Sequence, residues 1–123
     1  MQISQDSVPS TIAAAVDAIV VSIDETEREF IRSESRSHLA VHHTVGRYIR
    51  NAWSLWDPDS PIKRDAIATY RIAHADDISG LILSWVAAKV RDEEFNPFAE
   101  CERFHQHWAS CDMTSLEAGG VTE

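Results

Sequence analysis

Two short segments of this 123-residue chain concentrate side chains that could do chemistry. The first carries a histidine and an arginine eight positions apart, which lie on one side of a helix if the segment is helical. The second carries a histidine and two aspartates within four positions. Brought together, an imidazole and a carboxylate could form a general acid–base pair or line a small-ligand pocket. The cluster comprises His42, Arg50, Asn51, His74, Asp76 and Asp77.

A structural role explains the same polar residues more simply. An arginine and a carboxylate pair bidentately, and buried pairs of this kind often fix the register of two helices. If the segment that begins at Asp76 packs on the helix that holds Arg50, their charges meet. We therefore expect an ion pair and a capped helix here. A ligand site or a hydrolytic enzyme site remains the alternative.

A second set of residues near the C-terminus resembles a zinc site in composition only. Cysteine and histidine are the usual zinc ligands, and the set is Cys101, His105, His107 and Cys111. On one helix the two cysteines lie roughly 15 Å apart, so only Cys101 and His105 could share an ion. We expect no metal, no other cofactor and no disulfide. The sequence also lacks nucleophile-elbow, phosphate-loop and zinc-protease motifs, so we expect no enzyme.

The charge is distributed unevenly along the chain. Residues 1–35 hold seven acids and two bases, residues 36–91 five acids and eight bases, and residues 92–123 eight acids and one base, for a net charge of −9. An acidic chain repels nucleic acid, so we expect no direct nucleic-acid binding. A partner protein with a basic, nucleic-acid-binding surface would be attracted. The residues expected to contact it are Glu25, Glu27, Glu29, Asp92, Glu93, Glu94, Glu100, Glu102, Trp56, Phe104 and Trp108.

Helical periodicity dominates the elements that must position these residues, because apolar side chains recur every three or four positions. The predicted fold is all-α, a compact bundle of about six short helices. We expect helices over about 10–23 and 37–55, and others that begin at Asp24, Ser60, Asp76 and Asn96, each a residue type that caps helices. Residues 1–112 are expected to form a single domain, and residues 113–123 a flexible polar tail.

No apolar run is long enough to cross a membrane, and the first residues do not resemble a secretory signal. The expectation is therefore a cytoplasmic protein without membrane contact.

Two motifs resemble those of a small bacterial family of helical domains of unknown function. They are H-x-x-x-G-x-Y-I-R-N-x-x-x-L-W, from His42 to Trp56, and H-x-D-D-x-S-G-x-I-L, from His74 to Leu83. The resemblance covers residues 9–91 and implies a compact helical domain, but no reaction. In size and acidity alone, the chain also resembles phage inhibitors of bacterial defence, including anti-CRISPR proteins.

The leading hypothesis is thus a non-enzymatic, acidic protein-binding module, an inhibitor or adaptor of the anti-defence type that covers a basic surface. One alternative is a ligand-binding or hydrolytic site at the polar cluster. The other is a homodimer formed through the last helix, which begins at Asn96.

Overall fold

The computed structural model describes residues 9–33, 49–50, 53, 55 and 57–121. These parts of the chain contain helices and no strand, so the prediction of an all-α fold is confirmed. None of these helices has the length and apolarity that a bilayer crossing requires. The elements are α1 (Ile12–Ser22), α2 (Glu25–Ser33), α5 (Pro61–Asp65), the π-helical turn η2 (Ala66–Tyr70), α6 (Ala75–Val90), α7 (Pro97–Ser110) and α8 (Ser115–Ala118).

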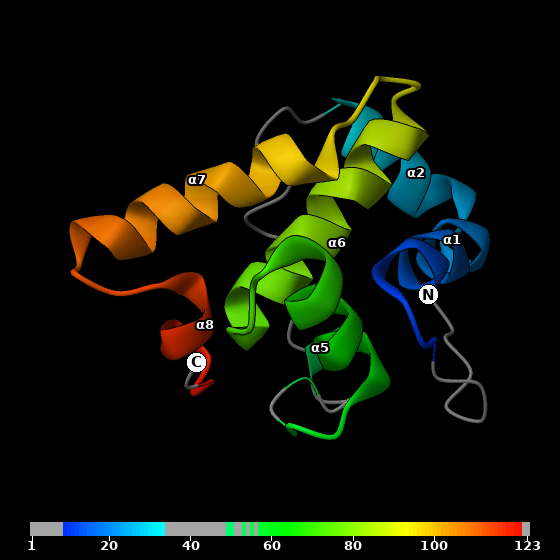
Figure 1. The fold of residues 1–123 in the computed structure, drawn as a ribbon. Helices are drawn as coiled ribbons and strands as arrows, with labels where there is room; N and C mark the ends of the chain where they lie inside the picture. The colour runs from blue at the N-terminus through cyan, green and yellow to red at the C-terminus, as the bar shows by residue number, and fades with distance from the viewer. Residues whose placement is uncertain (1–8, 34–48, 51–52, 54, 56, 122–123) are drawn as a thin grey trace.

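Helix α6 is central to the described fold. It contacts α1 and α2 on one side and α7 on the other, and Figure 1 shows it between them. Burial on several sides explains why α6 is apolar around most of its circumference. Its fully buried residues Ile78, Leu81 and Ile82 join Ile12 and Ile19 of α1 in one core cluster.

The central helix expected over residues 37–55 lies mostly outside the described residues. Three of its described side chains, Ile49, Trp53 and Leu55, are buried in the same core cluster.

Local capping signals in the sequence predicted several helix starts correctly. Asp24 and Glu27 form the reciprocal hydrogen bonds of a capping box before α2. Ser60 before Pro61 and Asn96 before Pro97 cap α5 and α7. Two starts were misplaced by one or two residues.

At α1 the cap is Thr11, one residue after Ser10, where the predicted helix over about 10–23 was expected to begin. At α6 the cap is His74, whose Nδ1 accepts the Asp76 N–H at 3.0 Å, so the prediction that Asp76 caps this helix is wrong.

The C-terminal segment differs from the flexible polar tail expected over residues 113–123. Thr114 and Glu117 form a capping box that starts α8, and Ser115 and Leu116 are buried. The Lys63 Nζ donates to the Gly119 carbonyl at 3.4 Å. The sequence prediction missed this packing because the segment carries only one large apolar residue that becomes buried, Leu116.

Candidate functional site

The predicted ion pair of the polar cluster is present at the start of α6. Arg50 Nε lies 3.5 Å from Asp76 Oδ1, and another guanidinium nitrogen donates to Ser79 Oγ at 2.8 Å. The Arg50 side chain is only 12% exposed, whereas that of Asp76 is 55% exposed. The guanidinium therefore joins its own segment to the first turn of α6, which is the structural role predicted for it.

Asp77 bonds to a different element from the one expected. Its Oδ2 accepts the indole N–H of Trp108, on α7, at 2.8 Å, and the carboxylate is buried. Burial raises the pKa of Asp77, while the Trp108 hydrogen bond and the nearby His74 act in the opposite direction. The ring of His74 lies 5.6 Å from that of Trp108, between centroids. Asp77 thus fixes α7 to α6.

The described residues of the polar cluster therefore make contacts that stabilise helix α6 and its packing. His74 caps α6, Asp76 pairs with Arg50, and Asp77 accepts from Trp108. His42 and Asn51, the other two residues assigned to it, lie outside the described residues, as does Trp56. His74 Nδ1 lies 3.9 Å from Asp76 Oδ2, beyond hydrogen-bond distance, and accepts the Asp76 N–H instead.

The residues considered as zinc ligands are separated in the structure. Cys101 is buried, and burial raises the pKa of its thiol to about 12, whereas Cys111 is exposed. His105 shares a 2.6 Å hydrogen bond with Ser115 Oγ, and the His107 ring packs edge-on against that of Trp108. No three potential metal ligands gather among the residues with described positions.

The His105–Ser115 contact has the composition of a nucleophile and its base, but Ser115 is only 2% exposed. A substrate could not reach its hydroxyl, so the bond ties α8 to α7.

A groove of about 540 Å³ lies between α6 and α7. Helix α7 runs back along α6: Phe95 stacks on Trp85 near the end of α6, with ring centroids 5.7 Å apart, while Trp108 reaches Asp77 near its start. The apolar lining of the groove is formed by Gly80, Leu83, Ala87, Ala88, Phe95 and Phe104.

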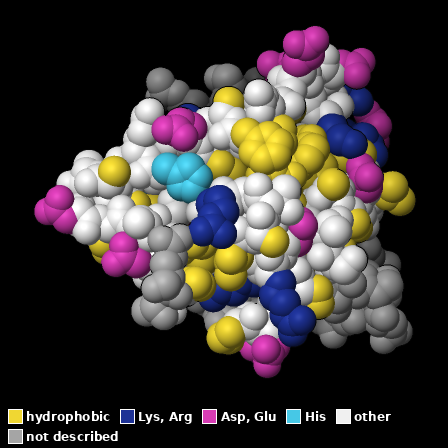
Figure 2. Space-filling view, viewed as in Figure 1, with side chains coloured by type: hydrophobic (Ala, Val, Ile, Leu, Met, Phe, Trp, Pro, Cys, Tyr) yellow, Lys and Arg dark blue, Asp and Glu magenta, His cyan; other side chains and the backbone are white. Residues whose placement is uncertain are grey.

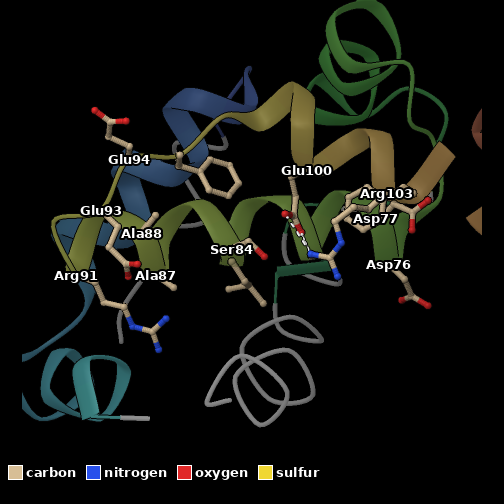
Figure 3. A pocket seen from close by; sticks show the side chains of 14 residues that line it. Asp76, Asp77, Ser84, Ala87, Ala88, Arg91, Glu93, Glu94, Glu100 and Arg103 are labelled. Carbon is tan, nitrogen blue, oxygen red and sulfur yellow. Dashed lines mark hydrogen bonds and ion pairs between the residues drawn. The ribbon is translucent and has the colours of Figure 1, made fainter. Parts of the chain in front are cut away.

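The groove carries more negative than positive side chains. Its described lining includes five carboxylates and two guanidinium groups, and Figure 3 shows them at the two ends. Glu93 and Glu94 lie with Arg91 at one end, and the other end is lined by Asp76, Asp77, Glu100 and Arg103. Apolar side chains between acidic ends suit a ligand that is itself both apolar and basic.

The acids predicted to bind a partner fall into distinct groups. Glu93, Glu94 and Glu100 line the groove. On α2, Glu25 and Glu29 both pair with Arg32, at 3.0 and 3.5 Å, and Glu27 belongs to the capping box. Asp92 and Glu102 are exposed and do not belong to the described groove lining.

Figure 2 shows the acids of one face as separate groups around its edge, not as one continuous patch. On the face it shows, hydrophobic side chains gather over the N-terminal end of α7, where Phe98 is 59% exposed and its ring centroid lies 5.1 Å from that of Tyr70.

Two of the three aromatic residues predicted to contact a partner, Phe104 and Trp108, make intramolecular contacts. Phe104 is partly buried against the core and lines the groove, and a Cβ at Gly80 would lie 3.7 Å from its ring. Trp108 is hydrogen-bonded to Asp77. The place of Leu83, Ala87 and Arg103 in the groove was not predictable from the sequence, because a groove between two helices depends on how they pack.

Comparisons with known proteins give one result. No curated protein and no solved structure matches the chain significantly. A model of the family described as "Domain of unknown function (DUF6794)" matches residues 8–89. The match extends from before α1 almost to the end of α6, so α7 and α8 lie outside it. Because the family model covers most of the chain, this protein belongs to the DUF6794 family.

Proposed function

We propose that this protein is a non-enzymatic binding module that takes a basic, amphipathic segment of a partner protein into the groove between α6 and α7. The observation that carries the proposal is the composition of this groove. Its described lining combines apolar side chains with five carboxylates and two guanidinium groups. Three of these carboxylates, Asp76, Asp77 and Glu100, already bond to protein groups, so the acids open to a partner are Glu93 and Glu94. Binding would shield the partner's basic surface from nucleic acid, so the protein would act as an inhibitor or adaptor.

The charge layout gives the partner its expected chemistry. Glu93 and Glu94 have no ion-pair partner in the described part of the chain, so their charges are available to a ligand. Ala87 and Phe104, which are partly exposed, offer apolar contact between the two charged ends. Lysine or arginine would supply affinity at the ends and steer association, whereas aliphatic side chains would fill the middle.

A counter-defence role against a nucleic-acid-binding protein is the biological form of this proposal, in line with the resemblance in size and acidity. The proposal includes a cytoplasmic location, which agrees with the free thiols of Cys101 and Cys111. A small-ligand site at the polar cluster is less well supported, because Arg50, Asp76 and Asp77 already bond to other protein groups.

The test compares two double charge reversals that change the net charge equally. Glu93→Lys/Glu94→Lys alters the groove, and Glu25→Lys/Glu102→Lys alters exposed acids outside the described groove lining. The probe is a fluorescent amphipathic peptide with arginines on one helical face and leucines on the other. We expect the groove variant to bind it at least about tenfold more weakly and with a smaller salt dependence, and the control to stay within about twofold.

Equal weakening by both variants would mean that only net charge matters, and would overturn the groove proposal. Unchanged binding by the groove variant would also overturn it. The same variants can be used to recover a natural partner from lysate. A protein that binds the unmodified chain and the control, but not the groove variant, would extend the result from the peptide to a protein.

A further inference from the structure

One carboxylate in the groove is held by a cation of the same helix. Arg103 donates from one guanidinium nitrogen to both carboxylate oxygens of Glu100, at 3.1 and 3.4 Å. The two partners differ strongly in exposure: the Glu100 side chain is 19% exposed and that of Arg103 is 75% exposed. The acid is thus embedded in the groove wall, while the arginine reaches it from solvent, and Figure 3 shows this pair on the groove.

A second carboxylate lies at the same end of the groove. Asp77 lines it too, and one of its oxygens, Oδ2, is used by Trp108. Asp77 comes from α6 and Glu100 from α7, and both line the same end of the groove, as Figure 3 shows. Two mostly buried carboxylates therefore face this end of the groove. Among the described residues, Arg103 is the cation that pairs with Glu100.

We propose that Glu100 is the docking point for a cationic side chain of the partner, and that Arg103 occupies this point in the free protein as an internal competitor. The inference deepens the proposed function and rests on it. When the partner binds, its arginine or lysine takes the place of Arg103, whose side chain turns into solvent.

The exchange is physically reasonable because the two sides of the ion pair differ in desolvation. Removing any cation from Glu100 would leave a mostly buried carboxylate without a counter-charge, which is costly. Replacing one cation by another avoids that cost. Arg103 itself loses little on release, because its side chain is 75% exposed within the pair and regains rotamer freedom when freed. Arg103 would therefore lower the affinity of the groove for weakly basic segments and leave strongly basic ones able to bind.

The experiment uses the same arginine–leucine peptide and four forms of the full chain. They are the unmodified protein, Arg103→Gln, Arg64→Gln and the double variant Arg103→Gln/Glu100→Gln. Arg64 is the matched control, since it is also exposed, lies 3.7 Å from a carboxylate (Asp59), and is absent from the described groove lining. Both single variants remove one positive charge. A difference between their affinities for the peptide therefore depends on where the charge was removed and not on the net charge.

We expect Arg103→Gln to bind the peptide about two- to fivefold more tightly than Arg64→Gln does. The double variant should lose this gain and bind more weakly than the unmodified protein, because the docking carboxylate is gone. Equal affinities of the two single variants would overturn the competitor role. A gain that persists without the Glu100 carboxylate would overturn the docking point.

Failure of this inference is distinguishable from failure of the proposed function. If the unmodified protein binds the peptide through the groove but Arg103→Gln matches Arg64→Gln, the groove function stands and the internal competitor does not. If neither the unmodified protein nor Arg103→Gln binds, both proposals are overturned together.

Discussion

At the scale of single residues, Asp77 shows how one buried carboxylate carries two opposing effects. Its hydrogen bond from Trp108 stabilises the α6–α7 contact, while its burial raises its pKa. A raised pKa in the folded state means that the folded protein holds the proton more tightly than the unfolded chain. The ionised form therefore lowers stability above that pKa, and this penalty disappears as the pH falls through it.

Asp77→Asn separates the two effects, because asparagine keeps an acceptor oxygen for the Trp108 indole and removes the charge. We expect this variant to be at least as stable as the unmodified protein at neutral pH. The difference in the free energy of unfolding between this variant and the unmodified protein should shrink as the pH falls from the raised pKa of Asp77 toward the ordinary aspartate pKa of about 3.9. Urea unfolding at a series of pH values measures this difference, with His74, His107 and Asp76 present in both proteins.

Asp77→Ala is the control for the lost hydrogen bond. It leaves the indole N–H of Trp108 without its acceptor, and we expect a loss of about 1–3 kcal/mol in the free energy of unfolding. If the asparagine variant were as unstable as the alanine variant at neutral pH, the charge itself would be stabilising and our account of Asp77 would be wrong.

At the scale of elements, the sequence predicted best what depends on neighbouring residues. Ser60 with Pro61, Asn96 with Pro97, and Asp24 with Glu27 cap their helices as expected, because each cap bonds to backbone within three residues. The ion pair of Arg50 with Asp76 was also predictable from their complementary charges, although it forms through a single 3.5 Å contact rather than the bidentate pair expected.

Elements that depend on tertiary contacts were not predictable in the same way. The helix that starts at Ser60 passes into the π-helical turn η2 and ends at Arg71, which has φ +59°. Nothing local in the sequence marks that wide turn. Likewise, the Asp77–Trp108 bond joins residues 31 positions apart, so it arises only from the way α7 returns along α6. The groove depends on the same packing.

The C-terminal cap of α8 gives a prediction about close backbone approach. A Cβ at Gly119 would lie 2.3 Å from the carbonyl carbon of Ala73, and backbone cannot move aside as a flexible side chain can. We expect Gly119→Ala to lower the free energy of unfolding by about 1–3 kcal/mol, through displacement of α8. Thermal or urea unfolding measures this loss.

Gly80→Ala provides the matched control, since the same methyl group would be added at ordinary contact distance, 3.7 Å from Phe104. This position is inside α6, so alanine should be neutral or up to about 1 kcal/mol stabilising. Equal stability of the two variants would show that α8 does not depend on its close approach to Ala73.

At the scale of the whole molecule, the match to the family model ends at residue 89, but the packing continues beyond it. Helix α7 buries Cys101, places Phe104 against the core cluster and supplies the Trp108 donor to Asp77. Helix α8 adds the buried Leu116. The C-terminal helices therefore act as a part of the core, and α7 also forms one wall of the groove.

Removal of residues 92–123 tests this view of the molecule. The truncation would leave Asp77 buried without its donor or newly exposed, and would uncover the apolar side of α6 that faces α7. Single domains have a total stability of only about 5–15 kcal/mol. We therefore expect that losing the contacts of α7 and α8 with the core abolishes cooperative unfolding. Near-ultraviolet circular dichroism, thermal unfolding and light scattering measure the tertiary structure, stability and oligomeric state of both forms.

The control for this truncation is Trp108→Phe, which removes only the N–H donor. It should remain folded, with a loss of about 1–3 kcal/mol in the free energy of unfolding. A truncated protein that stays folded and monomeric while the full chain forms a dimer would contradict our account, and would assign α7 to an interface between two copies.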